Sequence, residues 1–443
     1  MQRRSSLFLA ATLLCSFLEL PARQATAADV SSVFQFRTFI QSVLETQPAI
    51  LSAKADLKAA QEQTKQTAAL LLPSVHLNAS QSYNQTDWNH DTSKSNPEEV
   101  GVSLTQPVYN RATWLAHERA KPYVALYEAD LNAAQQNLLW DIIQVTLDFL
   151  QAQEVAKLAK NNQEVLKNHL ASTQARYQVG EITQTDVRQA EARLAQARAK
   201  QIGADNAVQT SRARFQEIIG TTPPIGLMVP KVVQANLKFS SEKREALLET
   251  RPDIRALQER LKYASLSIEI EEAGYLPEVS LSTSLNRDWN DGSNRGTPVD
   301  QFSISVGLKL PLYSGGMTVS RIDQKRAEKE ALAAQLDLNR LQAMREIESA
   351  ELSLTSTQAE TVAYQSSVTA AQEALNGFQS EYEVGSRTAL DLLDAQNTLF
   401  SAQTDLAKSH YDEIRNQYQL LLAMGQLRLE FFDIEKGALS ADK

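Results

Sequence analysis

The two halves of this 443-residue chain carry the same landmarks in the same order, 204 to 205 residues apart. The repeated pairs are Thr46-x-Pro48 with Thr250-x-Pro252, Leu72-Pro73-x-Val75 with Leu276-Pro277-x-Val279, Pro107-x-Tyr109 with Pro311-x-Tyr313, and Tyr177-x-Val179-Gly180 with Tyr382-x-Val384-Gly385. A spacing that persists over four separated landmarks predicts an internal duplication, in which each half forms one structural unit. We assign residues 28–235 to the first repeat and residues 236–430 to the second.

The amino terminus has the features of a secretory signal. Arg3 and Arg4 precede an apolar stretch over residues 7–18, and the small residues at positions 25–27 suit a cleavage site. The apolar stretch is too short to cross a bilayer as a helix, which argues against a membrane anchor. We therefore predict that residues 1–27 are a signal peptide.

Composition narrows the class of protein. The chain has only 15 glycines and 13 prolines, which favours long helices with few breaks. Its net charge is -9 and it has no basic cluster, so we expect no binding to nucleic acid. The only cysteine, Cys15, lies in the predicted signal, so the mature chain is expected to have no disulfide and no lipid anchor on cysteine.

Two long stretches are nearly free of helix breakers, residues 111–178 and 317–383. In the first, apolar or small residues recur every seven positions, at Leu131, Leu138, Val145, Ala152, Ala159 and Leu166. Such a repeat predicts left-handed coiled packing. At about 1.5 Å per residue each helix would be roughly 100 Å long, which predicts an elongated rod or wall.

Shorter helical stretches accompany the long ones. They are expected at about residues 46–72 and 183–219 in the first repeat, and at about residues 252–276 and 388–424 in the second. In each half their summed length nearly equals that of the long helix, so we expect them to lie end to end beside it. The proline-rich segment at 221–230 predicts a connector between the repeats, and residues 431–443 predict a loose tail.

Two segments change from the helical period to strict alternation, which predicts β-hairpins at 74–106 and 278–310. Each strand is about nine to eleven residues long, the length that a tilted strand needs to cross an outer membrane. We expect polar loops at 86–98 and 287–300. Prolines are expected at the helix–strand transitions, at Pro73, Pro107, Pro277 and Pro311.

A soluble sheet with one face on a core is the commoner fate of such strands. Two features favour a membrane instead: the long helices offer no sheet-sized apolar partner, and the non-apolar face carries small Ser, Thr and Asn residues, as suits a wet lumen. Four strands cannot close into a barrel, and unpaired edges are not tolerated in lipid. Three copies of the chain would supply twelve strands.

Several motifs together resemble the TolC family of outer-membrane efflux proteins over essentially the whole mature length. They are the two Tyr-x-Val-Gly turns, each followed by Thr and Asp, Pro-Leu-Tyr-Ser-Gly-Gly at 311–316, Arg-Pro-Asp-Ile at 251–254, and Thr-Ala-Leu-Asp-Leu-Leu-Asp-Ala at 388–395. The absence of a mature cysteine departs from the lipoprotein branch of the family, in which the motif at 251–254 is common.

The resemblance implies a mostly α-helical protein with a β-barrel part. Three chains would form a twelve-stranded outer-membrane barrel, continued by a long periplasmic α-helical barrel. It also implies an exit duct for efflux or type I secretion, located in the cell outer membrane with a large periplasmic part. The implied partners are two further copies of the chain, outer-membrane lipid, a periplasmic adaptor protein, and an inner-membrane efflux pump or ABC exporter.

The candidate functional residues lie at the turns farthest from the predicted barrel. Gly180 and Gly385 are suited to end the long helices in a left-handed conformation. Thr183 and Thr388 are suited to cap the helices that follow.

Asp391 and Asp394 are three residues apart and therefore share one helical face. In a trimer they would form rings of three carboxylates in a narrow aqueous opening, and the resemblance implies the same, because the matching aspartates line the periplasmic aperture. The alternative is a pair of solvated charges near a helix amino terminus.

The resemblance also implies a latch that holds the tip shut. Tyr382 and Arg387 would be its bonding residues, with Thr185 and Asp186 as their partners on the neighbouring helix pair. The alternative for Arg387 is an ordinary surface cation.

Catalytic and cofactor motifs are not evident. The histidines, at positions 76, 90, 117, 169 and 410, do not have the spacing of metal ligands, and no phosphate-binding glycine loop occurs. We therefore expect no enzyme activity, cofactor or metal. Two rival classes remain: a periplasmic coiled-coil scaffold without a channel, which leaves the four strands unexplained, and a secreted or surface enzyme, which lacks a site.

Overall fold

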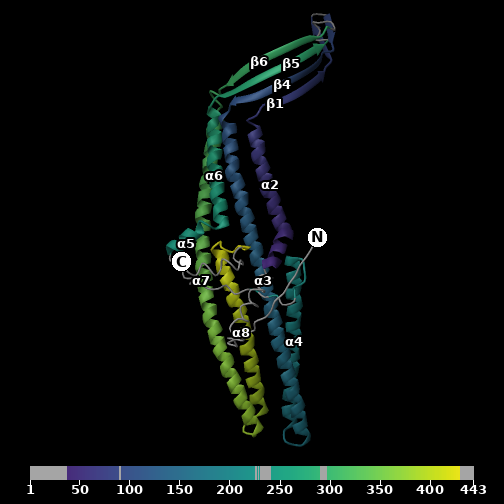
Figure 1. Ribbon diagram of the computed structural model, residues 1–443, viewed down its shortest axis with the longest axis vertical. Coiled ribbons are helices and arrows are strands. Elements are labelled where there is room, and N and C mark those ends of the chain that lie inside the picture. The colour runs from purple at the N-terminus through teal and green to yellow at the C-terminus, as the bar shows by residue number, and fades with distance from the viewer. Residues whose placement is uncertain are drawn as a thin grey trace, which may run out of the picture.

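A computed structural model describes residues 37–88, 91–224, 227, 229, 241–289 and 297–429. The predicted signal peptide, the tail at 431–443 and positions 225, 226, 228 and 230 of the predicted connector lie outside the described residues. The molecule is elongated, with a sheet at one end and two helical turns at the other (Figure 1). None of the described helices is both long and apolar enough to cross a membrane.

The described helices and strands are as follows. The helices are α2 (Pro48–Ala69), α3 (Arg111–Gln178), α4 (Gln184–Ile219), α5 (Ser241–Leu248), α6 (Pro252–Glu272), α7 (Met317–Glu383) and α8 (Ala389–Ala423), with a 3-10 turn, η1 (Ala273–Tyr275). Residues 37–46 are also helical. The strands are β1 (Ser74–Gln81), β2 (Asn84–Trp88), β3 (Asp91–Ser95), β4 (Glu98–Tyr109), β5 (Glu278–Trp289) and β6 (Val299–Lys309).

The two long helices run through most of the molecule, and the shorter ones lie beside them (Figure 1). α2 and α4 pack on α3, α8 packs on α7 and also on α3, and α6 lies against both long helices. α2 and α6 each begin with a proline, whose missing N–H is no loss in the first turn of a helix. The short helix α5 packs on α7 and was not predicted from the sequence.

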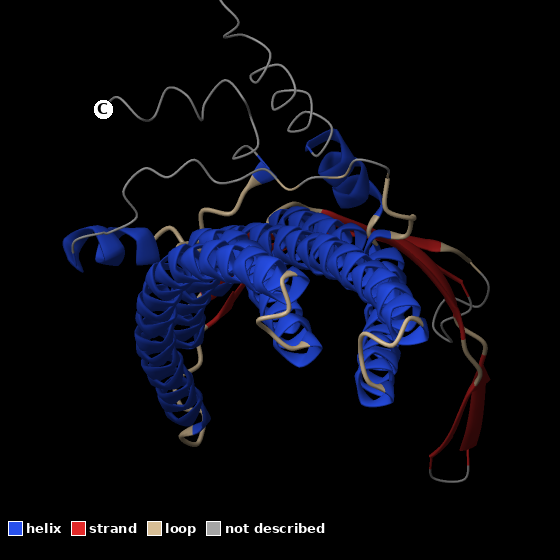
Figure 2. Ribbon diagram, turned by 90° about the horizontal axis from the view of Figure 1, so that it is seen from below, coloured by secondary structure: helices blue, strands red, loops and turns tan. Residues whose placement is uncertain are grey.

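Seen from the helical turns, the helices line up as a curved wall that is open on one side (Figure 2). The seven-residue row of α3 faces its neighbours, because Leu138, Val145, Ala159 and Leu166 are all buried. The largest apolar core lies near the middle of the molecule and joins α3, the end of α4, α5, α7 and the end of α8. Side chains from both repeats therefore stabilise the same region.

The four long strands form one antiparallel sheet in the order β1-β4-β5-β6. The two hairpins thus meet through β4 and β5, while β1 and β6 are edge strands.

The expected loops were partly wrong. β2 pairs with β3 inside the expected loop at 86–98, since Asn84–Trp88 and Asp91–Ser95 are themselves extended. β5 and β6 continue into the expected loop at 287–300, where Arg287 faces Asp300 in register and binds it at 2.5 Å.

Strand register gathers the apolar residues on one face of the sheet. Val306 lies beside Leu281, and Phe302, Leu285, Val102 and Leu77 lie side by side across four strands. The opposite face carries small polar residues and glycine, for example Ser303 beside Ser284, Ser103 and His76. On the apolar face, the β6 side chains are largely exposed in the single chain: Ile304 is 63% exposed and Val306 is 70% exposed.

Three of the four prolines lie between a helix and a strand. Pro73 precedes β1, Pro277 precedes β5, and Pro311 follows β6. Pro107 instead lies within β4, at an irregularity in its pairing with β5. A bulge accommodates proline in a strand because a ladder hydrogen bond is already missing there.

Candidate functional site

The two turns at the end opposite the sheet have the same construction. Gly180 and Gly385 have φ angles of 81° and 76°, a conformation that favours glycine. Thr183 and Thr388 then cap α4 and α8, and each forms a reciprocal capping box with the aspartate three residues later. The internal duplication is thus visible in the hydrogen bonds of the tips.

Asp391 is the capping aspartate of α8. Its Oδ2 accepts hydrogen bonds from the Thr388 backbone N–H at 3.1 Å and from the Thr388 hydroxyl at 2.8 Å. These bonds lower the pKa of Asp391 below its usual value, so its carboxylate keeps its charge at neutral pH. Asp186 makes the equivalent bonds to Thr183 in α4. The first-turn role that the sequence left open for Asp391 is therefore present in the chain.

Asp394 has a different partner. Its Oδ1 lies 2.5 Å from a terminal nitrogen of Arg193 on α4, so the ion pair joins the second repeat to the first. Sequence reasoning missed Arg193, because the two residues are 201 positions apart and no local motif connects them.

Tyr382 lies against α3 of the same chain. The Arg176 guanidinium carbon is 4.8 Å from the centre of the Tyr382 ring, and the His169 ring centre is 6.1 Å away. Arg176 is held in turn by Glu181 at 3.0 Å. The sequence offers no signal for this group, because His169 and Tyr382 lie on different helices in different repeats.

Arg387 binds within its own turn. Its Nε donates to Glu381 Oε2 at 2.7 Å, and its guanidinium lies 4.8 Å from the centre of the Phe378 ring. Among the hydrogen bonds and ion pairs of the described residues, none joins Tyr382 or Arg387 to Thr185 or Asp186. The expected latch partners are therefore not brought together within one chain.

His169 is a titratable group at the contact between α3 and Tyr382. The side chain is half-buried, and its Nε2 has no hydrogen-bond partner in the described part of the chain. Burial lowers the pKa of His169 below its ordinary value of 6.5, and the nearby Arg176 charge lowers it further. The titratable groups that face the ring are Arg176 on α3 and Tyr382 on α7.

We expect this contact to weaken in mild acid. A lowered pKa in the packed state means that the unpacked state binds more protons, so stability is complete above about pH 6.5 and falls as the pH drops toward the lowered pKa. In the duct that the sequence predicts, conductance in planar bilayers should therefore rise between neutral pH and pH 5. His169→Gln, which stays neutral, should reduce this pH dependence; an unchanged profile would contradict the prediction.

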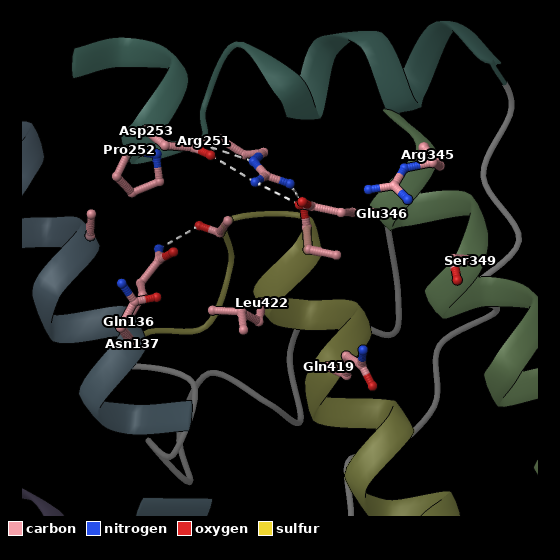
Figure 3. Close-up of a pocket in the computed structure, with 13 residues that line it drawn as sticks. Gln136, Asn137, Arg251, Pro252, Asp253, Arg345, Glu346, Ser349, Gln419 and Leu422 are labelled. Carbon is pink, nitrogen blue, oxygen red and sulfur yellow. Dashed lines mark hydrogen bonds and ion pairs between the residues drawn. The ribbon is translucent and has the colours of Figure 1, made fainter. Parts of the chain in front are cut away.

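A cavity lies where the start of α6 and the end of α8 meet α3 and α7 (Figure 3). Its volume is about 520 Å³. Arg251 lines this cavity, and its guanidinium donates to Asp253 at 2.7 Å, to Glu346 at 3.0 Å and to the Ala423 carbonyl at 2.8 Å. Gln136 donates to the Gly425 carbonyl at 2.8 Å. The cavity is therefore a structural junction between the repeats.

Gly425 has no room for a side chain at this junction. Its φ angle is 68°, and an added Cβ would lie 2.9 Å from the Arg251 Cα.

Within the described ranges, His, Cys, Asp and Glu side chains do not gather in a group of three that could hold a metal ion.

Comparison with known proteins identifies relatives of both repeats. The family model described as "Outer membrane efflux protein" matches residues 39–221 and again residues 244–426. The chain is 28% identical to the outer membrane protein TolC of Vibrio cholerae, over 90% of this chain and 92% of that protein. It is 30% identical to the outer membrane efflux protein BepC of Brucella suis, over 74% of this chain and 72% of that protein.

Solved structures show the same fold. The outer membrane protein VceC of Vibrio cholerae superposes with a TM-score of 0.78 at 22% identity, covering 88% of this chain and 96% of that chain. The two matches to one family model begin 205 residues apart, which confirms the internal duplication read from the sequence.

Proposed function

Because the chain belongs to the outer membrane efflux protein family, we propose that its helix tips form a closable aperture in a trimeric exit duct. The protein is an outer-membrane channel for efflux or type I secretion, and the family consists of transport channels. The observation that carries the proposal is a sheet with one exposed apolar face and one face of small polar residues. The sheet lies at the end of the long helices opposite the tips (Figure 1).

Trimerisation is supported by the sheet edges. β1 and β6 each have a neighbour on one side only, and an unpaired strand edge is not tolerated in lipid. If β6 of one chain pairs with β1 of the next chain, the curved wall of Figure 2 continues from one copy to the other. Three copies would then close it with twelve strands.

The tips carry the gate of this proposal. Asp391 and Asp394 from three chains would form two carboxylate rings, a concentrated negative potential in a narrow opening. In a closed ring each α7–α8 hairpin has two neighbours, its own α3–α4 hairpin and that of the next chain. Tyr382 contacts its own α3, so we place Thr185 and Asp186 of the next chain as the partners of Arg387.

Cation block tests the rings. We expect the double variant Asp391→Ala, Asp394→Ala to be blocked less strongly by a trivalent cation added on the periplasmic side, because the attracting charge is lost. The measurement is single-channel current in planar bilayers against cation concentration. Asp205→Ala serves as a control, since Asp205 is an exposed aspartate partway along α4. Block of normal strength in the double variant would show that the rings lie elsewhere.

The energy for transport would come from partners. A periplasmic adaptor and an inner-membrane pump or ABC exporter would meet the helix tips, and the chain itself would act without enzyme activity. Deleting the gene and comparing drug susceptibility with export of candidate secreted proteins would identify the cargo. A deletion that leaves both unchanged would count against the duct.

A further inference from the structure

The contact between α4 and α8 has basic side chains seven residues apart. Arg193 of α4 binds Asp394, and Lys200 donates to Asn397 Oδ1 at 3.2 Å and lies 5.1 Å from the centre of the Phe400 ring. Residues seven apart share one face of a helix, so both cations of α4 reach across to α8.

An apolar strip lies between the two cations. Leu194 and Ala197 of α4 are buried against Leu393 of α8 and Leu166 of α3. The α3–α4 and α7–α8 hairpins of one chain therefore meet through a small apolar cluster with a cation at each end. This is the contact that must loosen if the α7–α8 hairpin moves away from α4.

We propose that Arg193 is a positioning residue of the aperture, which ties α8 to α4 and masks the charge of Asp394 while the tips are closed. The inference rests on the proposed function and names a regulation of the same site. When the hairpins separate, Asp394 loses its cation and becomes a free carboxylate. The aperture thus becomes more negative as it opens.

Asp391 and Asp394 differ in whether their partner lies on the same helix or on another one. Asp391 is bonded to Thr388 of its own helix, and this bonding moves with the helix, so its charge contributes equally in the closed and the open state. Asp394 is bonded across the contact to another helix, so its free charge depends on whether the contact is made. Arg193 is two-thirds shielded from solvent, which strengthens its interaction compared with a fully hydrated cation.

Arg188 of the same helix provides a matched control. It is exposed and binds Glu191 of α4 itself at 2.7 Å, so this pair does not connect two hairpins. Arg188→Ala should therefore change neither conductance nor cation block.

A charge exchange tests the inference on the full-length trimer in planar bilayers. Arg193→Ala and Asp394→Ala should both raise conductance, because each removes the ion pair between the hairpins. Arg193→Ala should lower the trivalent-cation concentration for half block several-fold, whereas Asp394→Ala should raise it. The reversed pair Arg193→Asp, Asp394→Arg should return conductance toward that of the unmodified channel, whereas each reversal alone should raise it. Elution as a trimer checks that each variant folds.

The outcomes distinguish this inference from the proposed function. If Asp391→Ala with Asp394→Ala weakens block but Arg193→Ala leaves both block and conductance unchanged, the role of Arg193 is wrong and the carboxylate rings stand. If cation block is unchanged in the variant Asp391→Ala, Asp394→Ala, the carboxylate rings are wrong. The conductance of the reversed pair then still decides whether Arg193 and Asp394 hold the hairpins together. A reversed pair whose conductance equals the combined effect of the two single reversals would overturn the inference.

Discussion

Ile304→Arg should abolish insertion of the trimer into the outer membrane. Ile304 is at the middle of β6, on the apolar face of the sheet, and its side chain is 63% exposed. An arginine on the lipid face of a barrel costs about 2–4 kcal/mol at the bilayer midplane, and a trimer carries three of them. The expected result is loss of heat-resistant trimer from the outer-membrane fraction and loss of channel activity.

The neighbouring residue supplies the control. Ser305 faces the opposite side of β6 and pairs with Ser282 of β5, among small polar side chains. Ser305→Arg should therefore insert normally, because a cation in a wet lumen keeps its hydration. Normal insertion of Ile304→Arg, or equal loss in both variants, would contradict the assignment of the two faces.

The double variant Tyr382→Phe, Arg387→Ser should raise single-channel conductance several-fold. The tyrosine hydroxyl and the arginine are the bonding groups of the proposed latch, and both lie within the last turn of α7 or the turn that follows it. Removing Arg387 also leaves Glu381 without its 2.7 Å partner and removes a positive charge that acts on Asp391. Like charges brought together at the tips favour separation of the hairpins.

The same two exchanges elsewhere on α7 give a matched control. Tyr364→Phe with Arg345→Ser alters the same residue types far from the tip, and we expect the conductance of the unmodified channel. Comparing the two double variants at equal pH separates the latch from a general weakening of α7. Conductance that rises equally in both would rule out a latch at Tyr382 and Arg387.

Much of the fold was predictable because it follows from local periodicity. The helices α3 and α7 lie where breakers are nearly absent, and the sheet lies where alternation replaces the helical period. The errors arose where polar residues form strands. β2 and β3 have little apolar alternation, so their pairing depends on the adjacent hairpin, which holds the two segments close together.

The backbone construction of the tip turns was also predictable. Gly180, Gly385 and the capping threonines are local signals, and they lie at the turns as local geometry requires. The partners of the candidate residues were not predictable. Whether Tyr382 meets His169 or Asp186 depends on how the tip of α7 lies against α3 and α4, and no motif within either segment encodes that placement.

The duplication, the lengths of the helices and the two faces of the strands follow from the sequence alone, because each depends on residues within a few positions of one another or on the comparison of the two halves. Which charges are paired depends instead on how the helices pack. Arg193 and Asp394 lie 201 positions apart, and their contact exists only because α3 and α8 pack side by side and bring α4 to α8. Ion pairing decays over a few ångströms, so it depends on helix register that the sequence pattern leaves open.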